Sequence, residues 1–93
     1  MRMEKTTYTA ANYGEALQAM KNGHRVAREG WNGKNMYAFM IKRWHTGHED
    51  AADKILRPFT ALKDAQGRVG PWVPSSSDQL AEDWTIYPKP DGS

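Results

Sequence analysis

The pair Asn32-Gly33 stands between two segments with the composition of β-strands, and this arrangement constrains the fold more than any other feature of the chain. Asn and Gly adopt the positive φ angles of a tight hairpin turn more readily than other residues. Residues 24–29 precede the turn, and residues 35–44 follow it. The sequence therefore predicts a β-hairpin, and with it an antiparallel sheet.

The second strand of this hairpin is apolar on both faces. One face would carry Met36, Ala38 and Met40, and the other Tyr37, Phe39 and Ile41. A strand of this kind is expected at the centre of a sheet or at an interface between subunits.

A helix is predicted from about Tyr13 to Asn22. Asn12 can cap its first turn, and Glu15 stands three residues later, which is the spacing of a capping box. Gly23 follows at the position where helices commonly end on a glycine. We expect this helix to cover one face of the sheet.

The rest of the chain predicts a small α+β domain. Ser76 and Gln79 have a second capping-box spacing, which favours a short helical turn from Ser77 to Glu82. The segment 45–54 is a polar connection, and further strands are expected over 57–63, 68–73 and 84–87. The whole is one domain, 1–93, with an ordered core of about 8–87 and a tail, 88–93, that frays. We expect an N-terminal helix packed on an antiparallel sheet of about four or five strands.

Composition limits the possible partners. The 93 residues carry 13 basic and 11 acidic side chains, a balance that argues against a nucleic-acid polymer as ligand. No apolar run reaches the length of a membrane helix, and residues 1–5 are not followed by a secretory h-region, so we expect a cytoplasmic protein. The chain has no cysteine, and its small core and open sheet edges favour self-association.

Trp31 is the first candidate binding residue. Turns give a large ring little cover, and Arg28 and Lys34 flank it. A ring with nearby cations suits a flat anionic ligand such as a nucleotide. The alternative is that the ring folds back and caps the core, and the segment alone leaves both interpretations open.

A second group of candidates follows along the chain. Trp72 lies between two prolines, and a rigidly held ring can stack on a base, although it can equally pack in the core. Arg57 is held extended by the following proline and could bind a phosphate, or could be a solvated strand end. Ser76 and Ser77 could bind an anion at a helix start, or could serve as caps.

The sequence predicts neither a metal site nor an enzyme. His45 and His48 have a chelating spacing, but Gly47 disfavours a helix there, so we expect a solvated loop. There is no nucleophile elbow, and Glu82 and Asp83 would alternate faces of a strand. We therefore expect no catalytic residue, no metal and no cofactor.

In order along the chain, five blocks resemble the Thoeris anti-defense 2 family of phage and prophage proteins. They are residues 12–17, 26–34, 57–58, 71–75 and 78–84. The Arg-Glu-Gly-Trp-Asn-Gly-Lys block and the Ala-Glu-Asp-Trp block are the most specific.

The resemblance implies a homotetrameric sponge with ligand pockets between subunits. Such a protein sequesters glycocyclic ADP-ribose without cleaving it, and some members bind cyclic dinucleotides at a separate pocket. Trp31 and Trp72 match aromatic residues that sandwich the bases, Arg57 matches a phosphate-side cation, and Lys34 and Asn35 match more weakly. A nucleotide-degrading enzyme and a structural or regulatory phage protein are the alternatives.

Overall fold

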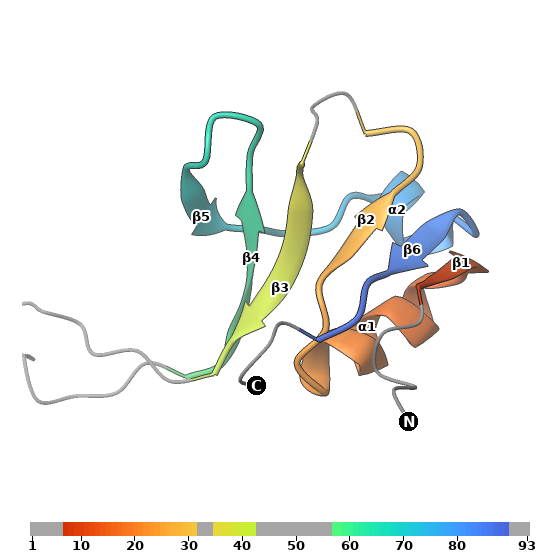
Figure 1. The fold of residues 1–93 in the computed structure, drawn as a ribbon, viewed down its shortest axis with the longest axis horizontal. Coiled ribbons are helices and arrows are strands. Elements are labelled where there is room, and N and C mark those ends of the chain that lie inside the picture. Colours follow the sequence, from red (N-terminus) through yellow and green to blue (C-terminus); the bar gives the residue numbers. More distant parts are fainter. Residues whose placement is uncertain (1–6, 32–34, 43–56, 90–93) are drawn as a thin grey trace, which may run out of the picture.

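The computed structural model describes residues 7–31, 35–42 and 57–89. These residues form a six-stranded antiparallel sheet with two helices on one face (Figure 1). The predicted α+β class is confirmed, and the predicted number of strands is corrected from four or five to six. The strand order across the sheet is β1-β6-β2-β3-β4-β5. The polar connection 45–54 and the end of the tail, 90–93, lie outside the described residues.

Helix α1 (Tyr13–Lys21) follows the predicted pattern closely. The Asn12 side chain accepts a hydrogen bond from the Glu15 amide at 2.8 Å, and the Glu15 carboxylate accepts one from the Asn12 amide at 2.9 Å. Gly23 has φ +99°, a conformation that side chains disfavour, and it ends the helix as expected. The helix buries Ala16, Ala19 and Met20 against the sheet.

The two strands of the predicted hairpin pair with each other at the centre of the sheet, while the predicted Asn32-Gly33 turn lies outside the described residues. Strands β2 (Val26–Arg28) and β3 (Tyr37–Ile41) pair with Val26 opposite Ala38. Strand β3 also pairs along its whole length with β4 (Phe59–Lys63). One face of β3 contributes Ala38 and Met40 to the core under α1. The prediction of a central strand is therefore confirmed.

The edge strand β1 (Tyr8–Ala11) is absent from the sequence prediction. It pairs with β6 (Trp84–Ile86), and its register shifts between Tyr8 and Ala11, where Ala10 has φ +60°. A short, irregular and largely exposed segment shows no alternation, so only its partner strand defines it as a strand. The other edge is β5 (Val69–Pro71).

Helix α2 (Ser76–Leu80) begins one residue earlier than predicted. Ser75 is its N-cap, and the reciprocal partner is Asp78, so the predicted Ser76–Gln79 capping box is wrong. Two neighbouring serines, Ser75 and Ser76, each have a polar partner three residues later, so the local sequence offers two registers for the cap. In the observed register the Asp78 carboxylate pairs with Arg28 on β2 and also accepts a hydrogen bond from the Ser75 amide.

Candidate functional site

A pocket of about 510 Å³ lies beside β2, at the end of the sheet where β2 and β3 are connected. Its wall includes two residues predicted from the sequence, Trp31 and Asn35, together with Arg25, Arg28 and Tyr37. The volume falls within the range of small-molecule sites. The structure thus brings part of the predicted binding set to one hollow.

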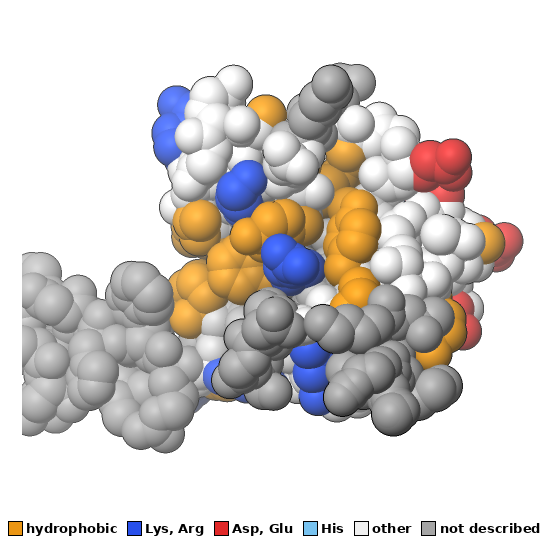
Figure 2. Space-filling model, in the orientation of Figure 1, with side chains coloured by type: hydrophobic (Ala, Val, Ile, Leu, Met, Phe, Trp, Pro, Cys, Tyr) orange, Lys and Arg blue, Asp and Glu red, His pale blue; other side chains and the backbone are white. Residues whose placement is uncertain are grey.

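The pocket opens on the sheet face turned away from α1 and α2. Figure 2 views this face and shows hydrophobic side chains over the middle of the sheet with Lys and Arg side chains among them. Tyr37 and Phe39 lie on it with ring centroids 5.7 Å apart. No described helix covers this face, so aromatic and cationic groups are available to a ligand or to another subunit.

Trp31 belongs both to the pocket wall and to an aromatic cluster of Tyr13, Trp31, Trp72 and Trp84. Its ring centroid lies 5.5 Å from that of the fully buried Trp84 and 6.0 Å from that of Trp72, at interplanar angles of 81° and 75°. Edge-to-face pairs of this kind stabilise a packed cluster. The two interpretations of Trp31 are therefore compatible, because one side of the ring packs while the residue still lines the hollow.

Trp72 lies in the same cluster but not in the pocket wall. Its ring also contacts Tyr13 at 6.4 Å, and its amide donates to the Thr60 carbonyl at 3.0 Å. The Trp31 and Trp72 rings meet edge to face. They therefore form one continuous aromatic surface and are not two parallel rings with room for a base between them. Ser76 and Ser77 are exposed on the first turn of α2 and do not line this pocket.

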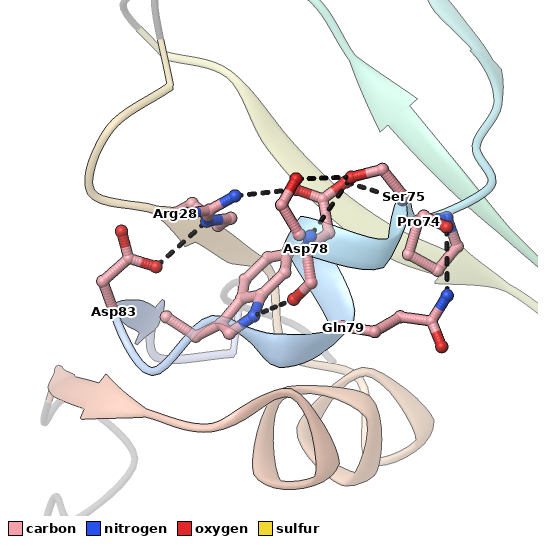
Figure 3. A network of polar contacts seen from close by, with 8 residues as sticks. Arg28, Pro74, Ser75, Asp78, Gln79 and Asp83 are labelled. Atoms are coloured by element: carbon pink, nitrogen blue, oxygen red, sulfur yellow. Dashed lines mark hydrogen bonds and ion pairs between the residues drawn. The ribbon is translucent and has the colours of Figure 1, made fainter.

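A network around Arg28 fixes α2 against the sheet (Figure 3). The Arg28 guanidinium donates to Asp83 through Nε at 3.0 Å and to Asp78 through Nη1 at 3.1 Å. Trp84 adds a bond from its indole Nε1 to the Asp78 carbonyl at 3.0 Å. These contacts join β2, α2 and β6, so they hold the base of the aromatic cluster in place.

The network also shifts the pKa of Asp78. Partial burial of the carboxyl raises its pKa, but hydrogen bonds from Ser75 and the Arg28 guanidinium outweigh this effect, so the pKa lies below its ordinary value. The pKa of Tyr13 is raised by burial and by the negative charge of Asp78. Asp78 is therefore a carboxylate at neutral pH, and Arg28 is fully engaged with acidic partners.

A second cationic group surrounds Tyr37. The Arg25 guanidinium carbon lies 5.0 Å from the centre of the Tyr37 ring, and the Lys63 ammonium lies 5.4 Å from it. Lys63 also donates to the Asn35 carbonyl at 2.9 Å, and Asn35 itself has φ +63°. Asn is among the residues that best tolerate this conformation. Lys63 thus secures the turn that carries a predicted ligand contact.

The structure separates Arg57 from this pocket. Arg57 lies just before β4, beyond the end where Phe59 faces Ile41, whereas Asn35 lies beyond the opposite end, where Lys63 faces Tyr37. Arg57 is exposed there. Two further predictions, a ligand contact at Lys34 and a solvated loop containing His45 and His48, lie outside the described residues.

Sequence reasoning missed Arg25 and Tyr37 as pocket residues. Arg25 was not singled out because nothing in its neighbourhood forms a motif. A signal did exist in the strand period, because residues 25 and 27 share one face of an extended segment and the hairpin places Tyr37 beside them. Using it requires the register Val26–Ala38, which the Asn-Gly turn alone does not fix.

Two searches over the described residues bear on other functions. None of their helices is both long and apolar enough to cross a membrane. In the same part of the chain, His, Asp and Glu side chains nowhere gather in threes as a metal site requires.

Comparison with known proteins agrees with the resemblance seen in the sequence. The model of the Thoeris anti-defense 2-like domain matches residues 11–87. Thoeris anti-defense 2 of Bacillus phage SP01 is 38% identical over 85 residues, which cover 84% of this chain and 96% of that protein. The matched range includes all four residues of the aromatic cluster, Tyr13, Trp31, Trp72 and Trp84. The chain therefore belongs to the Thoeris anti-defense 2 family of phage anti-defense proteins.

Proposed function

We propose that this protein binds a cyclic nucleotide immune signal, glycocyclic ADP-ribose, in the cytosol of a bacterial host and holds it without cleaving it. Family membership supports an anti-defense role. The observation that carries the ligand class is the pocket beside β2, where the Trp31 indole and the Tyr37 phenol lie in one wall with Asn35 and Arg25. Rings and cations bind bases and phosphates.

The size of the ligand is compatible with the affinity that sequestration needs. An ADP-ribose derivative has about 36 non-hydrogen atoms, and ~0.3 kcal/mol per atom gives roughly −11 kcal/mol, near a nanomolar Kd. A protein that inactivates a signal one molecule at a time needs such affinity, because it has no turnover to multiply its effect.

Shared pockets in a homotetramer account for the positions of the remaining predicted residues. Trp72 and Arg57 do not line the pocket beside β2 of their own chain. A neighbouring subunit packed on the open face can bring its own Arg57 or Trp72 to a ligand that Trp31 contacts. Ser76, Ser77 and Lys34 belong to the same proposed set, and cyclic dinucleotides are proposed as ligands of a separate pocket.

Recovery of the bound ligand tests sequestration. The protein is mixed with a small excess of glycocyclic ADP-ribose, freed of unbound nucleotide and heated, and the supernatant is separated by chromatography. We expect about one intact nucleotide per pocket, because rings and cations can hold a nucleotide without polarising a bond. An unrelated protein of similar net charge carried through the same steps measures non-specific retention.

The other outcomes identify the alternatives. A cleaved product that accumulates beyond the protein concentration would show a nucleotide-degrading enzyme. Failure to retain any of a panel of cyclic nucleotides, with no rise in melting temperature, would favour a structural or regulatory phage protein.

A further inference from the structure

Arg25 is a pocket residue with unused bonding capacity. It stands directly before β2 and contacts the Tyr37 ring through its guanidinium. Its Nε is buried and has no hydrogen-bond partner. A buried N–H without an acceptor costs free energy, and such groups are rare in folded proteins. Because Nε is buried, a ligand would reach the guanidinium through its terminal nitrogens, Nη1 and Nη2.

The second arginine of the pocket provides an internal comparison. Arg28 lines the same hollow, but its guanidinium is bound by the carboxylates of Asp78 and Asp83. Within the described part of the chain, Arg25 has no ion pair. Arg28 is thus committed to holding α2, whereas the positive charge of Arg25 remains available.

The surroundings of Arg25 favour an anion. Lys63 lies on the neighbouring side of Tyr37, with its ammonium 5.4 Å from the ring centre. Two cations around one ring raise the local positive potential, and the ring adds an apolar surface. The pocket wall also contains the carboxylate of Glu29. Glu29 follows β2 at the Trp31 end, where its amide donates to the Asp83 carbonyl at 3.2 Å, whereas Arg25 precedes the same strand.

We propose that Arg25 binds a phosphoryl oxygen of the ligand through the terminal nitrogens of its guanidinium, beside Tyr37 and in the positive potential of Lys63, while the base lies toward Trp31. The identity of the ligand as a nucleotide rests on the proposed function, but the subsite itself rests on Arg25. An arginine fork matches phosphate geometry, and such charge-assisted bonds are stronger than neutral ones.

The test compares Arg25→Met with Arg68→Met. Methionine retains an apolar stem of similar length and removes the charge. Arg68 is an exposed arginine paired with Asp64, so its variant loses the same charge away from the pocket. Both variants and the wild type are titrated with glycocyclic ADP-ribose and, separately, with inorganic pyrophosphate. We expect Arg25→Met to weaken both by about 10- to 100-fold and Arg68→Met to leave both within about twofold.

The melting temperature without ligand separates binding from structure. Arg25→Met removes a buried Nε that has no partner, so the melting temperature without ligand should stay near the wild-type value. Lost affinity with an unchanged melting temperature supports the subsite. Wild-type affinity in Arg25→Met, or a lowered melting temperature with unchanged affinity, overturns it. If Arg25→Met does not fold, Arg25→Lys decides, because lysine keeps the charge but lacks the guanidinium fork, and wild-type affinity in this variant would contradict the proposal.

The two probes separate the two proposals. Arg25-dependent binding of pyrophosphate without binding of the cyclic nucleotide would support the subsite and refute the proposed ligand. Tight nucleotide binding that ignores Arg25, with no response to pyrophosphate, would refute the subsite and leave sequestration intact.

Discussion

At the scale of single residues, the four members of the aromatic cluster differ in what they contribute. Trp84 is fully buried, and its indole N–H is bonded, whereas Trp31 and Trp72 are only partly buried. Trp84 therefore acts as the packing centre, and Trp31 and Trp72 retain surface that a ligand can contact.

Substitution of the two partly buried rings should separate these contributions. We predict that Trp31→Ala and Trp72→Ala each weaken nucleotide binding by about 1–3 kcal/mol, because a stacked base contributes that much per ring. Trp84→Ala, as the contrasting variant, should lower the free energy of unfolding by about 3–5 kcal/mol. Calorimetric titration and thermal unfolding measure the two effects. A variant of Trp31 or Trp72 that binds normally but melts early would assign that ring to the core.

At the scale of elements, α2 depends on charge for its position. Five residues make too short a helix to be stable alone, so its cap and the Arg28 pairs hold it. The pKa of Asp78 lies below its ordinary value in the folded protein. Its contribution to stability is therefore present above the unfolded pKa, near ~3.9, and is lost as the pH falls through the lower folded pKa.

Asp78→Asn should reproduce this loss at neutral pH. The amide keeps the shape of the side chain but removes the charge that Arg28 contacts, which we expect to cost about 1–3 kcal/mol. Thermal unfolding between neutral pH and pH ~3 should then show a weaker acid dependence than the wild type. Some dependence should remain, because the pKa of Asp64 is also lowered, chiefly by a hydrogen bond from the Arg68 amide. An unchanged acid profile would show that Asp78 does not hold α2.

The elements also show how far local sequence determines this fold. Helix α1 is predictable because Asn12, Glu15 and Gly23 act within a few residues of one another. Strand β1 is not, since Ala10 leaves the extended conformation and the segment is a strand only through β6. The cap of α2 was placed one residue too late, because Ser75–Asp78 and Ser76–Gln79 both have the capping-box spacing; the observed helix uses Ser75, and its Asp78 also contacts Arg28.

The candidate site is likewise predictable where its residues are neighbours in sequence and not where strand pairing brings them together. Trp31 and Asn35 were identified because they flank one turn, and the structure places both in the pocket. Arg25 joins them only through the register of β2 on β3, and Arg57 lies at the far end of β4 because that strand runs antiparallel to β3. Sequence proximity therefore predicts the local half of the site, and strand pairing determines the remainder.

At the scale of the whole molecule, the described helices cover only one face of the sheet. The other face presents Tyr37 and Phe39 with cations beside them. Both rings are half-buried, and partly exposed apolar surface on an uncovered sheet face commonly marks an interface. The small core of this chain adds a reason for subunits to associate.

We predict a homotetramer in solution, and Phe39→Lys should reduce its mass by placing a charge on the open face. Light scattering during size-exclusion chromatography measures the mass, and circular dichroism confirms that the variant is folded. Gln66→Lys adds the same charge at the exposed β4–β5 turn and should leave the assembly unchanged. A monomeric wild type would rule out pockets shared between subunits.

The short ladder between β2 and β3 links ligand binding to the stability of the fold. Val26 and Ala38 are the one matched pair there within the described residues, against five pairs between β3 and β4. The pocket takes Arg25 and Tyr87 from one side of this junction and Tyr37 from the other. An occupant would therefore act as a crosslink between two halves of the sheet, and the proposed ligand would become part of the protein's own framework.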